Sequence, residues 1–196
     1  MVKKVENFSL STDEKKFCVE LAKRSIRHSL MNESPFSLAV SEVTHLPEPL
    51  KKKKASFVTL TKSGELRGCM GHLNAILPLY KDIIDNAFAA AFSDPRFEPL
   101  SAKEFSQINV EVSVLTTPVD FEFKDSAELL KSLVVGEDGL IISKGWNTAT
   151  FLPSVWDELP KKEDFLSHLC IKAGLSADDW KKPGLKVQKY KAIKAK

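Results

Sequence analysis

The sequence has few of the features that mark membrane, secreted or zinc-binding proteins. No stretch approaches the roughly 18 consecutive apolar residues that a membrane span needs. The N-terminal stretch MVKKVENFSLSTDEKK has no apolar segment behind its lysines, so it does not resemble a signal peptide and indicates a cytoplasmic protein. Three widely spaced cysteines favour neither a disulfide framework nor a four-ligand zinc site: Cys18, Cys69 and Cys170. We therefore expect reduced thiols, no metal and no other cofactor.

Arginine is scarce too, with only four in 196 residues. The net charge of +3 is uneven, because residues 181–196 hold seven lysines and no acid while the rest of the chain is mildly acidic. We expect this tail to be a solvated or edge-protecting face, since few arginines disfavour a nucleic-acid arm. P-loop, G-x-G-x-x-G and G-x-S-x-G motifs are absent, which argues against the commonest nucleotide enzymes and serine hydrolases.

Apolar periodicity predicts an α+β fold with a mainly antiparallel sheet. A capping-box pair, Ser11 with Glu14, precedes the first expected helix. The expected helices span about 12–30, 78–93, 126–133 and 161–173, and a short helical stretch should follow Leu152-Pro153. The expected strands span about 55–60, 66–70, 108–114, 140–143 and 185–193, the first two forming a hairpin. Residues 32–54 are expected to be irregular, with one strand, because prolines interrupt them.

The most unusual stretch is Leu66-Arg67-Gly68-Cys69-Met70-Gly71-His72. The two glycines remove side chains on either side of Cys69, so that backbone amides or a ligand can approach closely. Arg67 would stabilise a thiolate, and His72 would serve as a base or metal ligand if the turn folds it back. The alternative is a buried structural cysteine in a hairpin, because free cysteine is among the most buried residue types.

Two further polar groups are candidates for chemistry. In Asp94-Pro95-Arg96-Phe97-Glu98-Pro99, two prolines stiffen a turn that presents Arg96, which suits recognition of a carboxylate or phosphate. Alternatively, Asp94 and Arg96 form a structural pair that closes the preceding helix. Glu111 lies with Asn109 and Ser113 on the polar face of an otherwise apolar strand, where it would act as a general base or ligand, or simply be solvated.

Together these motifs resemble the AMMECR domain family, called AmmeMemoRadiSam system protein A in prokaryotes. The matching segments are 66–71, 86–87, 90–100, 110–116, 139–142, 152–155, 170–175 and Trp180. Their order and spacing hold from about residue 12 to 190. The resemblance implies one domain over 1–196, with larger and smaller subdomains around a cleft, and gene neighbours encoding radical-SAM and Memo-like proteins. One departure is Asp138, at a position where the family often has histidine.

From these observations we expect a cysteine-dependent enzyme, or enzyme component, that acts on a small anionic substrate with Memo-like and radical-SAM partners. Cys69 would be the nucleophile or redox thiol and Glu111 the base or orienting group, with Cys69, Arg96 and Glu111 lining one cleft. The expected binding residues are Arg67, Gly68, Gly71, Asn86, Asp94, Arg96 and Ser113. The alternatives are a non-catalytic adaptor or carrier of a peptide or metabolite for the same partners, and a nucleic-acid-binding protein.

Overall fold

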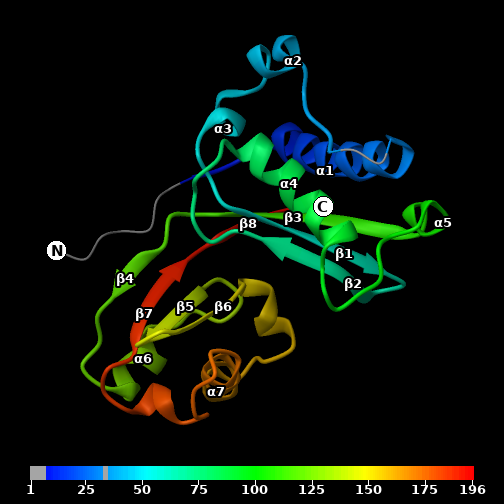
Figure 1. The fold of residues 1–196 in the computed structure, drawn as a ribbon. Coiled ribbons are helices and arrows are strands. Elements are labelled where there is room, and N and C mark those ends of the chain that lie inside the picture. The colour runs from blue at the N-terminus through cyan, green and yellow to red at the C-terminus, as the bar shows by residue number, and fades with distance from the viewer. Residues whose placement is uncertain (1–7, 33–34) are drawn as a thin grey trace. The chain divides into compact units, whose positions relative to one another are not determined.

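The computed structural model describes residues 8–32 and 35–196, and within them it has an α+β fold with two four-stranded sheets (Figure 1). The chain divides into two compact units. Among the described residues, the larger unit contains 8–115 and 193–196, and the smaller unit contains 116–192. The α+β class with mainly antiparallel pairing is confirmed. Residues 1–7 of the stretch compared with signal peptides lie outside the described residues.

The larger unit packs helices against one face of its sheet. The strand order is β2-β1-β3-β8. The strands are β1 (Ser56–Lys62), β2 (Glu65–Gly71), β3 (Ile108–Leu115) and β8 (Ala192–Ala195). The helices are α1 (Thr12–Asn32), α2 (Val40–Thr44), α3 (Glu48–Lys51), α4 (Leu79–Phe92) and α5 (Ala102–Phe105). The hairpin and the two long helices predicted from the sequence are confirmed, as is the third strand.

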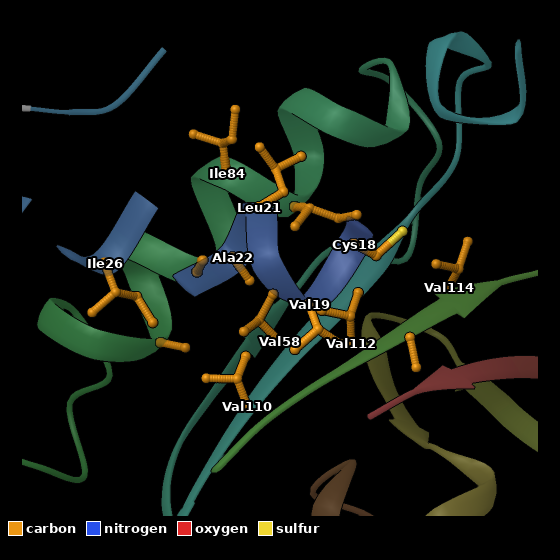
Figure 2. Packing of buried hydrophobic residues seen from close by; sticks show 14 of the residues in the cluster. Cys18, Val19, Leu21, Ala22, Ile26, Val58, Ile84, Val110, Val112 and Val114 are labelled. Atoms are coloured by element: carbon orange, nitrogen blue, oxygen red, sulfur yellow. The ribbon is translucent and has the colours of Figure 1, made fainter. Parts of the chain in front are cut away.

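The core of this unit forms between α1, α4 and one face of the sheet. Figure 2 shows apolar side chains from α1 and α4 meeting those of β1 and β3. The sheet contributes alternate residues, including Val58, Val110 and Val112, as the period of two in a half-buried strand requires. The capping box that starts α1 is present, since Ser11 N–H donates to Glu14 Oε2 and Glu14 N–H donates to Ser11 Oγ.

The prediction of a strand within 32–54 is wrong for the described part of that segment. Residues 35–54 instead contain the short helices α2 and α3. Pro47 directly precedes α3 and Pro49 lies in its first turn. Proline is tolerated there because the first helical N–H groups have no partner within the helix. Pro47 and Pro49 therefore mark the start of a helix, whereas the sequence-based prediction was an interruption of regular structure.

The smaller unit has the strand order β4-β7-β5-β6. The strands are β4 (Val119–Phe121), β5 (Gly139–Lys144), β6 (Asn147–Phe151) and β7 (Lys186–Tyr190). The helices are α6 (Ser126–Ser132) and α7 (Lys162–Lys172), with short 3₁₀ turns at Pro153–Asp157 and Asp179–Lys181. Its core is centred on Phe165, whose ring stacks on Trp156 with a centroid distance of 3.7 Å. Among the described helices, none combines the length and apolar content that crossing a bilayer requires.

The lysine-rich tail fits the expected solvated or edge-protecting face only in part: β8 is an edge strand, and Lys181, Lys182, Lys186 and Lys196 are exposed. Its single predicted strand is two strands, β7 and β8, in different sheets, and β7 is an interior strand. Lys191 Nζ lies 2.9 Å from Asp138 Oδ1, and Lys189 Nζ lies 3.5 Å from Asp138 Oδ2. Burial lowers the pKa of Lys189. These two lysines therefore neutralise a buried aspartate.

Candidate functional site

Cys69, Thr59 and Glu111 lie side by side across three strands of the larger sheet. Thr59 is the register partner of Cys69 on β2 and of Glu111 on β3. Because successive side chains alternate between faces, all three lie on the face opposite Val58 and its apolar neighbours. Thr59 Oγ1 lies 3.3 Å from Cys69 Sγ, within hydrogen-bonding distance for sulfur. The predicted thiol and carboxylate are therefore on one row of the sheet, and they are separated by a threonine that was not among the predicted site residues.

The backbone of Cys69 is held from outside the sheet. Cys69 N–H donates to Asp94 Oδ2 at 2.9 Å, and Arg96 Nη2 donates to the Cys69 carbonyl at 3.3 Å. β2 is an edge strand, so these groups face away from β1. Cys69 and Thr59 are therefore a non-hydrogen-bonded pair, the kind in which side chains approach most closely. The loop after α4 thus fixes the position of the thiol relative to Thr59.

Asp94 and Arg96 form the structural pair that was the alternative interpretation of this loop. Asp94 accepts from Arg96 Nε at 2.9 Å, from Nη2 at 2.7 Å and from the Arg96 N–H at 3.1 Å, and its side chain is only 2% exposed. The Arg96 hydrogen bonds hold the pKa of Asp94 well below its usual range, although burial opposes this. The pKa of Arg96 is raised, chiefly by Asp94 and in smaller part by Cys69. The pair does more than close the helix, because it also holds Cys69.

Arg67 lies at an irregularity in the hairpin. Leu60 pairs with Gly68 and Thr61 pairs with Leu66, so Arg67 has no partner on β1 and forms a bulge. Such an extra residue redirects a side chain. Arg67 Nη2 donates to Glu104 Oε2 at 3.1 Å and to the Glu98 carbonyl at 2.9 Å. Its Nη1 is buried and has no hydrogen-bond partner among the described residues.

Glu104 makes the pairing of Arg67 sensitive to acid. Hydrogen bonds from Arg67, then from Ser101 N–H and Lys62, lower the pKa of Glu104 from 4.5 to about 2. Because the folded pKa is the lower one, the stabilisation is complete above 4.5 and is lost as the pH falls toward 2. We expect Glu104→Gln to flatten this part of the curve of unfolding free energy against pH, measured by urea titration. Glu65→Gln removes an exposed carboxylate from the β1–β2 hairpin that contains Arg67, and it controls for the change in net charge. Superimposable curves for wild type and Glu104→Gln would contradict the assignment.

The two glycines around Cys69 make room for the protein itself. A Cβ at Gly68 would lie 2.2 Å from the Ala90 carbonyl oxygen of α4. A Cβ at Gly71 would lie 2.3 Å from the ring of Phe57, its register partner on β1. Close approach of backbone or of a ligand was predicted, and the groups that approach are the backbone of α4 and an aromatic ring. Packing against Ala90 and Phe57 therefore explains why positions 68 and 71 are glycine.

Asn86 is part of a separate polar cluster on the helix side of the sheet. Its amide donates to the Ser56 carbonyl and to Asp82 Oδ2. Asp82, 1% exposed, also accepts from Ser56 N–H and Oγ, each at 2.7 Å, while its other oxygen lies 2.7 Å from His72 Nδ1. His72 is therefore engaged by α4 and does not fold back to Cys69. Ser113, which is buried, lies one alternation from Glu111 on the same face of β3.

Glu111 has a cationic partner in the chain. Its Oε2 lies 2.9 Å from Lys196 Nζ, and its side chain is 21% exposed.

Within the described residues, no group of three or more histidine, cysteine or acidic side chains is placed to hold a metal ion. The row of Cys69, Thr59 and Glu111 thus offers a thiol, a hydroxyl and a carboxylate.

Comparison with known proteins gives consistent matches over most of the chain. The AMMECR1 family model matches residues 19–195. A Saccharolobus islandicus protein is 38% identical over 195 residues, covering 94% of this chain and 82% of that protein. A Methanothermobacter thermautotrophicus protein is 37% identical over 188 residues, covering 93% and 94%. The crystal structure of the uncharacterized protein PH0010 from Pyrococcus horikoshii superposes with a TM-score of 0.88 at 35% identity, covering 95% of this chain and 93% of that one.

Proposed function

The chain belongs to the AMMECR1 family, and from the surroundings of Cys69 we propose that it is a cysteine-dependent enzyme or enzyme component. The observation that carries the proposal is the fixation of Cys69 by Asp94 and Arg96 through both of its backbone polar groups. Pre-positioning of this kind is what a nucleophilic or redox thiol requires.

The other two cysteines have the surroundings of core residues. Cys18 and Cys170 are both fully buried, whereas Cys69 is partly exposed. Burial raises the pKa of Cys18 to about 12 and also raises that of Cys170. Because the thiolate is the reactive form, neither of these is suited to chemistry. The Cys69 carbonyl accepts from Arg96 Nη2 at 3.3 Å, so a guanidinium group lies beside this residue.

Geometry limits the roles of the neighbouring groups. Glu111 is two strands from Cys69, about 10 Å at the usual strand spacing, too far to take the thiol proton directly. Glu111 would therefore act on the bound substrate, once displaced from Lys196. Arg67 and Arg96 are both paired with carboxylates, so they are not free anion clamps.

The partners implied by family membership belong to the same proposal. We propose that the protein works with Memo-like and radical-SAM proteins and that the substrate is a small anion. A non-catalytic adaptor for these partners would use the same surface without needing the thiol. The dependence of function on Cys69 therefore distinguishes the enzyme from the adaptor.

Thiol labelling tests the proposal. With iodoacetamide near pH 7, we expect one rapidly labelled residue in the folded protein, Cys69, and labelling of all three cysteines only after unfolding. Arg96→Gln should change the labelling rate, because it removes the donor that holds the Cys69 carbonyl. Cys69→Ser should abolish rapid labelling with a loss of stability below about 1.5 kcal/mol, since the change is nearly isosteric.

If Cys69 stays unlabelled in the folded protein and the Cys69→Ser variant loses stability, Cys69 is a structural residue and the proposal is wrong. Peptide mapping by mass spectrometry assigns each label to its cysteine. Cys170→Ser is the matched control, because it removes a buried thiol and should leave the rapid labelling unchanged.

A further inference from the structure

A small cavity lies beside α4, within the larger unit. It has a volume of about 180 Å³. The residues that line it include Phe36, Leu38, Tyr80, Lys81, Ile84 and Asp85. At roughly 30 Å³ for each water molecule, the cavity has the volume of about six waters. It is smaller than the roughly 300–1,000 Å³ of pockets for drug-sized ligands, so its occupant is smaller than a drug-sized molecule.

The charged side of the cavity is formed by Lys81 and Asp85, four residues apart on α4. Both side chains are exposed, and neither forms an ion pair with another described residue. In a helix, a lysine four residues before an aspartate stabilises less than the reverse order does. Attraction between Lys81 and Asp85 therefore does not explain why both are present. The charges that act on Asp85 are Lys81, Asp82 and His72, and partial burial raises its pKa.

Apolar walls and two opposite charges occur together here. Residues four apart on a helix have Cβ atoms about 5–6 Å apart. The ammonium and carboxylate groups of an α-amino acid are joined through one carbon, so each can contact one of these side chains at the same time. The apolar side chain of the same amino acid then has Phe36, Leu38, Tyr80 and Ile84 as its surroundings.

We propose that this cavity binds a free α-amino acid with an apolar side chain. Its ammonium group is held by Asp85, its carboxylate by Lys81, and its side chain by the aromatic and aliphatic walls. The site is separate from the row of Cys69, Thr59 and Glu111, because α4 packs on the opposite face of the sheet. The test of amino-acid binding is therefore independent of the test of Cys69 chemistry.

Calorimetric titration with three related probes tests this site. L-phenylalanine carries both charges, phenethylamine lacks the carboxylate, and 3-phenylpropanoate lacks the ammonium group. We expect L-phenylalanine to bind with a dissociation constant near or below about 1 mM, and each truncated probe to bind about tenfold more weakly. Cys69→Ser should bind L-phenylalanine as the wild type does.

Two variants assign the charges. Asp85→Asn should weaken binding of both L-phenylalanine and phenethylamine by about tenfold. Lys81→Gln should weaken L-phenylalanine to a similar extent and leave phenethylamine unchanged. Both residues are exposed, so the variants should fold, and Lys103→Gln on α5 is the control for loss of a surface lysine. Absence of saturable binding up to about 10 mM, or wild-type affinity in both variants, would overturn the proposal.

Discussion

Replacing Asp94 with alanine should lower the free energy of unfolding by about 3 kcal/mol. The carboxylate is buried and accepts hydrogen bonds from Cys69 N–H and from three nitrogen groups of Arg96. Its removal leaves the Cys69 amide without a partner. Arg96 is half-exposed and regains water, which keeps the loss at the lower end of that for a broken buried ion pair. Urea denaturation at neutral pH measures the change.

A double-mutant cycle separates this pair from its surroundings. Arg96→Ala alone leaves a buried carboxylate with two backbone donors, the N–H groups of Cys69 and of position 96, and no cation, so it should also be costly. The double variant should then cost less than the sum of the two single variants. Additive losses would mean that Asp94 and Arg96 stabilise the fold independently. The labelling rate of Cys69 should change in every variant that lacks Asp94, because the loop no longer holds β2.

Much of the fold was predictable because local signals agreed. Three signals depend only on residues close together in the sequence, and each predicts a single local structure. They are the capping box, the apolar spacing of α1 and the turn between β1 and β2. Ser63 and Gly64 have positive φ of 54° and 87°, as a tight hairpin turn requires. The strands β4 and β6 were missed because β4 is only three residues long and β6 directly follows a turn.

The candidate site was only half predictable. Cys69, Asp94, Arg96 and Glu111 stand out by residue type, and the structure places them together or on one row. Thr59 does not stand out, because its role depends on the register that makes it the partner of both Cys69 and Glu111. A register is set by pairing between distant segments, and hairpin length alone does not reveal the bulge at Arg67.

In the sequence, Gly68 and Gly71 fit two explanations equally well: space for a ligand at a functional site, and space for close packing within the protein. Gly68 and Gly71 have no positive φ, so neither is required by its backbone conformation. The need for glycine arises from Ala90 and Phe57, which are distant in sequence or on the neighbouring strand. Only the packed structure identifies these neighbours.

Gly68→Ala should therefore be among the most damaging single-methyl additions in the chain, with a loss of about 3 kcal/mol in unfolding free energy. The added Cβ would meet the Ala90 carbonyl oxygen at 2.2 Å, and because that atom is helix backbone, β2 and α4 must separate. The displacement should also change the rate at which Cys69 is alkylated, since Cys69 is the next residue along β2.

Gly64→Ala is the matched comparison, because it adds the same methyl group in the same hairpin. Gly64 has a φ of +87° and open space around its Cβ position, so its variant suffers conformational strain of about 1 kcal/mol without a clash. Urea denaturation of both variants, with alkylation of Cys69 followed in parallel, gives the test. If Gly68→Ala is no less stable than Gly64→Ala, β2 is not held against α4 as closely as the structure shows. The position of Cys69 would then not depend on that contact.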